Sequence, residues 1–157
     1  MTTLTEPHET SSVDLRQVAQ LSPSGLALVA NLPKTSKQPE ISESRWFHAP
    51  HVDYLDDLLV RLVRGDLAKE GYIGLIIEEP PRHGKSELCS HYFPSWYLGT
   101  FPQNRVILSS YEADFAMSWG RKVRNTVSEW GHVFGVEVSK SSARLRWLSI
   151  ISAPAVG

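Results

Sequence analysis

The chain has 157 residues, of which 41% are hydrophobic and 21% are charged, and its formal net charge is −1. This length suits one domain of moderate size, and the composition excludes disorder throughout the chain. The near-zero charge excludes a uniformly basic nucleic-acid binder, so any contact with DNA requires a local basic face. The single cysteine, Cys89, excludes an internal disulfide bond and a metal site built from cysteines.

No stretch of the sequence predicts export or a place in a membrane. The N-terminal residues lack the basic segment and following apolar segment of a secretory signal. No apolar run approaches the ~20 residues that are needed to cross a bilayer. We therefore expect a protein of the cytoplasm, without a membrane partner.

Residues 1–44 predict an N-terminal segment that is partly flexible and partly helical. Residues 13–32 favour one or two short helices, with a break at 22–25, where serine, proline and glycine cluster. Residues 33–44 contain two prolines and three serines, which is typical of a loop or linker. We place a boundary here and treat 45–157 as the second unit of the chain.

The second unit alternates between helical and strand patterns. Apolar residues recur at three- and four-residue steps over 51–67, with Gly65 near the end, and again over 112–130. Short apolar runs at 72–77 and 105–110 predict buried strands of a parallel sheet.

Two further elements complete the expected order. Residues 85–98 favour a helix that Pro94 must kink or end. Residues 145–151 predict a last strand. A succession of strand, turn, helix, strand and helix is typical of a doubly wound α/β sheet.

The turn between the first predicted strand and the next helix contains the residues that indicate a biochemical function. Its residues 79–86, EPPRHGKS, approach the phosphate-loop pattern G-x-x-x-x-G-K-[ST], which follows a strand and opens a helix. Gly84, Lys85 and Ser86 match the pattern, whereas Glu79 replaces the first glycine. From these residues alone, a nucleotide site and a chance Gly-Lys-Ser triplet both stay open.

Each residue type in this loop suits phosphate chemistry. Backbone N–H groups at the start of a helix attract anions, and Gly84 lets the backbone approach a phosphate closely. Lys85 would place a point charge on the β- and γ-phosphates, and Ser86 would offer its hydroxyl to Mg²⁺. We therefore expect ATP and Mg²⁺ as cofactors, with Ser86 as the metal ligand and a nucleotide site formed by Pro81, Arg82, His83, Gly84, Lys85, Ser86 and Glu87.

The expected fold class is α/β, an incomplete P-loop NTPase-type sheet flanked by helices.

Four segments resemble the ATPase region of the large terminase subunits of phages. They are WFHAPHVDYLDDLL, PPRHGKSEL, FPSWYLG and RVILSSYEADFAMSWGRKVRNTV, which together cover about residues 45–130. The resemblance implies an ATP-driven motor that moves double-stranded DNA into a procapsid. It also implies a portal and a small terminase subunit as partners and assembly into a homo-oligomeric ring. Arg82 and Lys85 match the family's catalytic loop residues, and Arg82 would stabilise charge near the γ-phosphate.

The chain departs from the family pattern in two places. The acidic strand that holds Mg²⁺ and the nuclease domain that follows the ATPase domain are both missing from the sequence. The expectation is therefore a truncated or frameshifted terminase, a prophage remnant or a fragment that binds ATP but hydrolyses it poorly. The alternatives are another P-loop NTPase of the helicase-like kind and an inert remnant.

Other residues have two interpretations each. Trp46, Phe47 and His51 could flank an adenine ring or could simply pack in the core. The basic cluster Arg121, Lys122 and Arg124 favours a solvated helix face over a contact with DNA or a neighbouring subunit. The aromatic stripe Phe115, Trp119 and Trp130 favours core packing over base stacking, and Cys89 favours a small buried residue over a reactive thiol.

Overall fold

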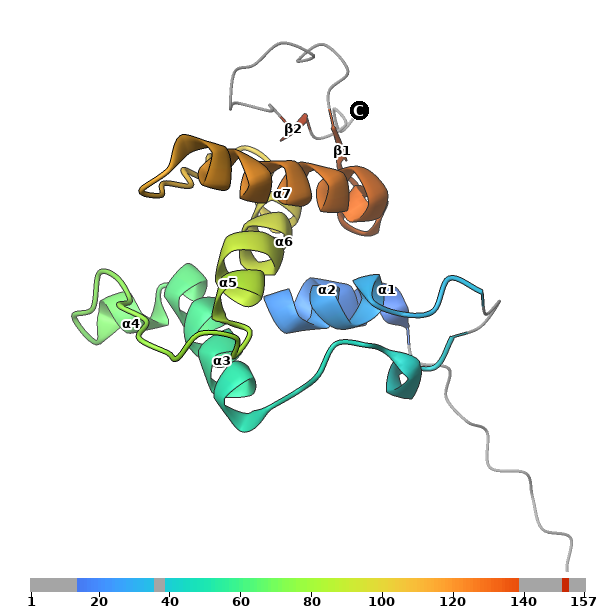
Figure 1. Cartoon of the computed structure of the whole chain (residues 1–157), viewed down its shortest axis with the longest axis horizontal. Helices are drawn as coiled ribbons and strands as arrows, with labels where there is room; N and C mark the ends of the chain where they lie inside the picture. The colour runs from blue at the N-terminus through green and yellow to red at the C-terminus, as the bar shows by residue number, and fades with distance from the viewer. Residues whose placement is uncertain (1–13, 36–38, 139–150, 153–157) are drawn as a thin grey trace, which may run out of the picture.

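The computed structural model of the chain is predominantly helical (Figure 1) and describes residues 14–35, 39–138 and 151–152. No helix among these residues is long and apolar enough to cross a membrane. The helical elements are α1 (Leu15–Leu21), α2 (Pro23–Ala30), the 3₁₀ turn η1 (Ile41–Glu43), α3 (Pro50–Arg64), α4 (Asp66–Lys69), α5 (Lys85–Glu87), the π-helical η2 (Leu88–Tyr92), α6 (Phe93–Thr100) and α7 (Ala113–Phe134). The strands are β1 (Glu137–Val138) and β2 (Ile151–Ser152).

Helices α1 and α2 confirm the predicted break between two short N-terminal helices. Ser22 caps α2, because its hydroxyl accepts a hydrogen bond from the amide of Gly25 at 3.1 Å. A Cβ on Gly25 would lie 2.1 Å from the carbonyl oxygen of Val18, so the two helices meet at their backbones. Both helices contribute buried side chains to the core, including Ala19 and Leu26.

Helix α3 confirms the predicted helix that ends near Gly65. Val52, Leu55 and Leu59 lie on its buried face at the expected three- and four-residue steps. Gly65 adopts a left-handed conformation with φ 76° and closes the helix, a position where a side chain would be strained.

Elements α5, η2 and α6 follow one another directly from Lys85 to Thr100. The amide of Phe93 donates to the carbonyl of Leu88, five residues earlier, as in a π-helix. Pro94, which has no amide hydrogen, follows in the first turn of α6, where no intrahelical donor is required. Pro94 therefore does not end the predicted helix; a π-helical turn accommodates it.

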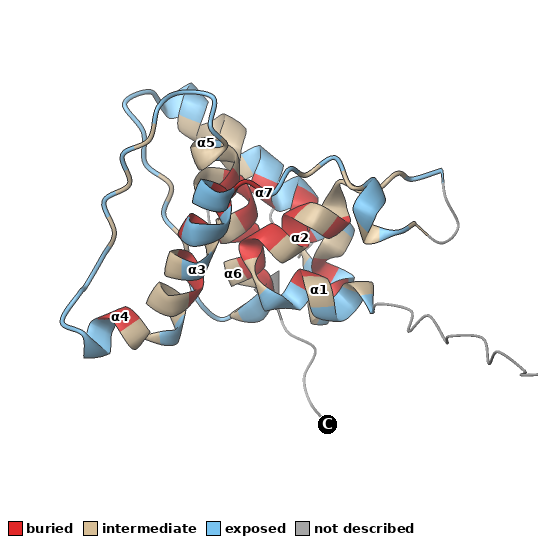
Figure 2. Cartoon of the chain, turned by 90° about the horizontal axis from the view of Figure 1, so that it is seen from below, coloured by how far each residue is buried: buried red, intermediate tan, exposed pale blue. Residues whose placement is uncertain are grey.

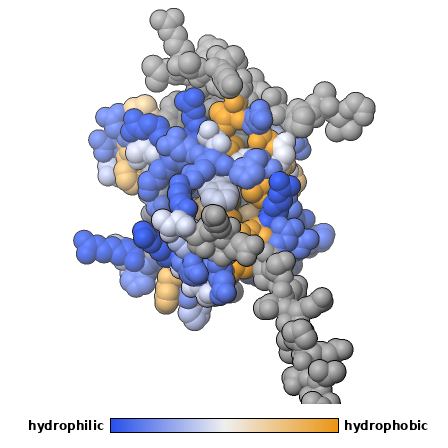
Figure 3. Space-filling model, turned by 90° about the vertical axis from the view of Figure 1, so that its right-hand side faces the viewer, coloured by the Kyte–Doolittle hydropathy of each residue, from blue (hydrophilic) through white to orange (hydrophobic). Residues whose placement is uncertain are grey.

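Helix α6 lies at the centre of the main core, between α1 and α2 on one side and α7 on the other (Figures 1 and 2). Tyr92 and Trp96 are buried there together with Leu26 and Val133. Figure 3 shows one outer face, which is mainly hydrophilic around a few hydrophobic patches. A second cluster joins α3 to Leu88, directly after the phosphate-loop motif.

The expected α/β sheet is wrong. The only sheet in the described part of the chain is an antiparallel pair, β1 and β2, which aligns Glu137 with Ser152. The predicted strands at 72–77 and 105–110 have no regular secondary structure. Apolar residues favour an extended backbone locally, but a strand also requires a hydrogen-bonded neighbour, and these two runs have none among the described residues. The strand predicted over 145–151 lies, except for its last residue, outside them.

Several apolar side chains of these two runs face solvent. Ile73, Ile76 and Ile107 are almost fully exposed. Leu75 instead packs against the α3 cluster, and Leu108 packs against buried valines of α7. Each of the two runs therefore packs some of its apolar side chains against a helix and exposes the others to solvent.

Hydrogen exchange tests this arrangement. The amides of residues 73–79 and 105–110 donate to no backbone carbonyl among the described residues, so we expect them to exchange at close to the rate of an unfolded peptide. The amides of α7 between Val123 and Val133 should be protected by several orders of magnitude, because the buried residues of the helix lie there. Mass-spectrometric exchange on peptic fragments would measure both, and strong protection of 73–79 would contradict the structure.

Candidate functional site

The phosphate-loop motif forms an irregular turn that enters helix α5. Arg82 has φ 68° and Gly84 has φ 89°, so both lie in the left-handed region. This conformation costs a residue such as arginine roughly 1–3 kcal/mol, and residues strained in this way cluster at active sites and ligand-binding loops. A Cβ on Gly84 would make only an ordinary 3.6 Å contact with Val52, so its positive φ, rather than space, favours glycine there.

Hydrogen bonds to carbonyl groups stabilise the turn from within and connect it to α3. The ring of His83 donates from Nδ1 to the carbonyl oxygen of Pro81 at 2.9 Å. His51 on α3 donates from Nε2 to the carbonyl oxygen of His83 at 3.0 Å. The ammonium of Lys85 donates to the carbonyl oxygen of Glu79 at 3.1 Å. The loop is thus secured through its carbonyl groups.

The amide groups of the same segment are available as donors. The N–H groups of residues 82–87 have no backbone or side-chain acceptor among the described residues, and the first bond of the helix runs from Leu88 to Gly84 at 2.9 Å. Unsatisfied amides at the start of a helical segment carry partial positive charge. This run of donors is the arrangement that binds phosphate at helix N-termini.

A cleft of about 230 Å³ lies at this loop. All seven residues predicted for the nucleotide site, Pro81 to Glu87, line it, together with Pro80 and Trp119. The structure therefore brings the whole predicted set together in one concave surface. Trp119 comes from α7, far along the chain, and closes the cleft from another element.

Glu87 connects the cleft to α7. Its carboxylate accepts from His91 Nδ1 at 2.8 Å and from Lys122 Nζ at 3.1 Å. Burial would raise the pKa of Glu87, but these two hydrogen bonds lower its pKa below the usual value. Glu87 is therefore an anion whose oxygens already have partners, so it is poorly placed to bind a metal ion.

His91 is the buried centre of this network. Burial lowers the pKa of His91 despite the neighbouring carboxylate, so the ring is neutral at pH 7. A neutral ring that donates from Nδ1 to Glu87 accepts at Nε2, where the hydroxyl of Thr126 lies 2.7 Å away. The hydrogen bonds thus link the cleft residue Glu87 to the middle of α7.

Trp119 lines the cleft, although the sequence did not predict it for the nucleotide site. The prediction that the aromatic residues of this helix pack in the core is correct only in part. The buried residues of α7 begin at Val123, and Trp119 is half-buried one turn before them. The ammonium of Lys122 lies 4.3 Å from the Trp119 ring centroid, and the Phe115 ring lies edge-on to the indole at 6.0 Å. No sequence signal separates Trp119 from its buried neighbours, because it shares their four-residue spacing.

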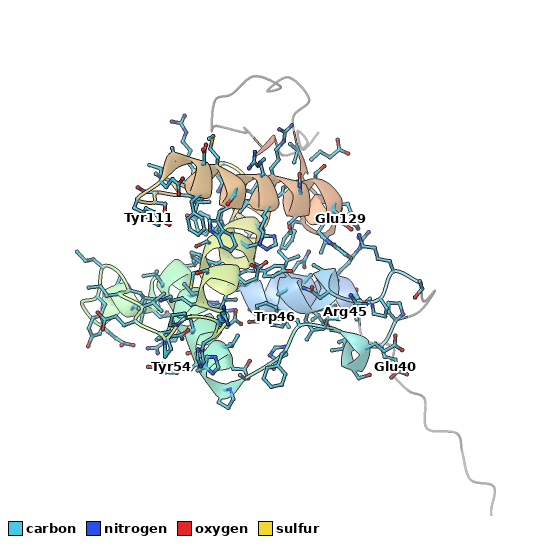
Figure 4. All side chains as sticks on the ribbon, in the orientation of Figure 1. Glu40, Arg45, Trp46, Tyr54, Tyr111 and Glu129 are labelled. Atoms are coloured by element: carbon cyan, nitrogen blue, oxygen red, sulfur yellow. The ribbon has the colours of Figure 1, made fainter. Side chains whose placement is uncertain are left out.

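The three residues expected to flank an adenine ring do not act together. Trp46, labelled in Figure 4, packs edge-on against Tyr92 at 5.1 Å and contacts the main core cluster. Phe47 is 79% exposed, and it joins none of the buried clusters. Only His51 reaches the loop, and its ring nitrogen is occupied by the carbonyl of His83.

Two other predicted features have clear outcomes. Burial raises the pKa of Cys89 to about 11, so its thiol is protonated at neutral pH and is not a reactive nucleophile. Arg121, Lys122 and Arg124 are all exposed on α7, and Lys122 forms an ion pair with Glu87. The basic cluster is therefore a solvated face with one member tied to the cleft.

The expected magnesium ligand, Ser86, lies on the exposed side of the cleft. Among the residues that the structure describes, no group of three or more histidine, cysteine, aspartate or glutamate side chains could hold a metal ion. The loop thus offers donors for an anion more clearly than ligands for a cation. Scans against protein-family models, curated proteins and solved structures gave no match to the chain.

Proposed function

We propose that the loop at 80–87 binds the phosphate groups of ATP. The observation that carries this proposal is the run of amides at residues 82–87, which have no acceptor among the described residues and belong to the segment that lines the cleft. Such donors attract an anion, and the following helical segment adds its dipole. This chemistry requires the turn and the helix, and it does not require a sheet.

Charged side chains of the loop complete the phosphate site. Lys85 donates to a neutral carbonyl 3.1 Å away, and a phosphate oxygen would be a stronger partner for its ammonium. Arg82 projects from an exposed, left-handed position, where its guanidinium could reach the terminal phosphate. Ser86 would bind Mg²⁺ that arrives with the nucleotide.

The larger role rests on the resemblance of the loop and the neighbouring segments to large terminase subunits. On this proposal the chain is the ATP-binding part of a motor that moves double-stranded DNA into a procapsid in the host cytoplasm. A portal and a small terminase subunit are its partners, and several copies form a ring. Arg121 and Arg124 are exposed on α7 and support a contact with DNA or with a neighbouring copy.

We expect ATP binding with little hydrolysis. A P-loop ATPase needs a carboxylate to position Mg²⁺ and the attacking water. The carboxylate that lines the cleft, Glu87, already accepts hydrogen bonds from His91 and Lys122. Binding and turnover should therefore be measured separately.

Replacement of Lys85 by alanine tests the phosphate site. Wild-type protein should be stabilised by Mg·ATP and by tripolyphosphate, by about 2.7 kcal/mol at a ligand concentration 100 times the dissociation constant. The Lys85→Ala variant loses the charge nearest the phosphates, and we expect both affinities to fall at least tenfold, since charged hydrogen bonds contribute about 1.5–3 kcal/mol. Isothermal titration and thermal unfolding would measure both effects.

Lys69→Ala is the matched control for this test. Lys69 is exposed on α4 and pairs with Asp66, and it does not line the cleft. Its loss should leave both affinities unchanged. Equal binding by wild type and Lys85→Ala would contradict the proposed site, and rapid Lys85-dependent phosphate release would contradict the expectation of little hydrolysis.

A further inference from the structure

The cleft at the phosphate loop has two walls of different chemistry. One wall is the polar segment 80–87, with its amide donors and the ammonium of Lys85. The other wall is the indole of Trp119, on α7. A ligand that fills the cleft must therefore present an anionic end and a flat or apolar end. Inorganic phosphate satisfies only the first requirement.

The position of Trp119 follows from the length of α7. Helix α7 has 22 residues and α6, the helix that it packs against, has 8. The buried residues of α7 lie between Val123 and Val133, so its N-terminal turns extend beyond the core. Trp119 lies in these N-terminal turns, so its neighbour is the phosphate loop and not α6.

The surroundings of Trp119 hold its ring in place. Lys122 lies 4.3 Å from the ring centroid and is fixed in turn by its ion pair with Glu87 at 3.1 Å. Trp119 lines the cleft, whereas Lys122 does not. The Phe115 ring packs edge-on against the indole, with an interplanar angle of 87°. An aromatic surface that is already ordered loses little entropy when a ligand stacks on it.

The size of the cleft suits a nucleotide better than a lone phosphate. Its volume is about 230 Å³. It approaches the roughly 300 Å³ at the lower end of pockets for small molecules. A nucleoside triphosphate could thus extend from the loop amides to the indole, with its outer part in solvent.

We infer that Trp119 is the base-stacking residue of this site and makes it selective for nucleoside triphosphates over inorganic polyphosphates. The inference rests on the proposed phosphate function of the loop and adds the ligand class that the site prefers. Stacking depends on the area of the aromatic ring, so purine nucleotides should bind more tightly than pyrimidine nucleotides. A flat indole carries no donor pattern that would separate adenine from guanine, so ATP and GTP should bind alike.

Parallel titrations of nucleotides and tripolyphosphate test the inference. Affinities of wild type and Trp119→Ala for Mg·ATP, Mg·GTP, Mg·CTP and magnesium tripolyphosphate would be compared by isothermal titration. Loss of one base–aromatic stack should weaken ATP and GTP by about 5- to 150-fold. The affinity for tripolyphosphate should change by less than about twofold, because the loop donors remain. Trp119→Phe should recover most of the loss.

Phe47→Ala is the control for a general effect of removing an exposed aromatic side chain, since Phe47 does not line the cleft. It should bind every ligand as wild type does. Equal weakening of ATP and tripolyphosphate in Trp119→Ala, or no weakening of ATP, would overturn the role of Trp119 while leaving the loop proposal intact. Trp119-dependent binding of single-stranded DNA without a change in ATP affinity would also overturn it. A wild-type protein that binds neither ATP nor tripolyphosphate would overturn both proposals.

Discussion

Replacement of Trp96 by alanine is expected to lower the free energy of unfolding by about 3–5 kcal/mol. Trp96 is 4% exposed and packs in the main core, where α6 meets α1, α2 and α7. Its indole also donates to the carbonyl oxygen of Gln20 at 2.9 Å, so the substitution removes a hydrogen bond near the end of α1. The loss is a large share of the ~5–15 kcal/mol that stabilises a typical domain. Urea unfolding followed by circular dichroism would measure it.

Two further variants separate packing from hydrogen bonding. Trp96→Phe keeps an aromatic ring in the core but loses the donor to Gln20, so we expect a smaller loss than in Trp96→Ala. Trp119→Ala removes a half-buried tryptophan outside the main core and should cost less than half as much. Similar losses in Trp96→Ala and Trp119→Ala would contradict the position of the core.

The second large effect is expected at Leu88, where alanine should cost about 2–5 kcal/mol. Leu88 is 0% exposed, and it lies directly after the loop, in a cluster with Val52, Leu55 and Leu59 of α3. This side chain joins the end of the loop at 80–87 to the apolar face of α3. A cavity at this position would leave its lining without contacts, because the interior relaxes only in part.

Leu21→Ala is the matched control for Leu88→Ala. Leu21 ends α1 and is 64% exposed, so its truncation should change the free energy of unfolding by less than about 0.5 kcal/mol. Chemical unfolding of both variants in the same buffer would compare them. A Leu88→Ala protein as stable as Leu21→Ala would show that the loop is not anchored to α3 as the structure describes.

Helices with a strong local pattern could be predicted from the residues alone. The stripe of Val52, Leu55 and Leu59 marked α3, and Gly65 marked its end, because a left-handed cap favours glycine. The serine and proline at the start of α2 marked the division from α1 in the same way. Each of these sequence patterns acts on the helix that contains it. The helices therefore form at the predicted places whatever the rest of the chain does.

The predicted strands failed because a strand depends on a partner elsewhere in the chain. Residues 72–77 and 105–110 have the apolar content of buried strands, but no described backbone pairs with them, and Ile73, Ile76 and Ile107 remain exposed. Local pattern can favour an extended backbone, but it cannot supply the neighbouring strand.

The proposed chemistry of the candidate site could be predicted from the sequence, since Gly84, Lys85 and Ser86 are adjacent residues whose donors would bind an anion without help from distant residues. The walls of the site were not visible. Tertiary packing places Trp119 at the cleft and Trp46 against the core, although both are tryptophans in apolar patterns. It also commits the carboxylate of Glu87 to His91 and Lys122. Local order follows from neighbouring residues, whereas the partners of a side chain depend on which helices meet and where each helix extends past the core.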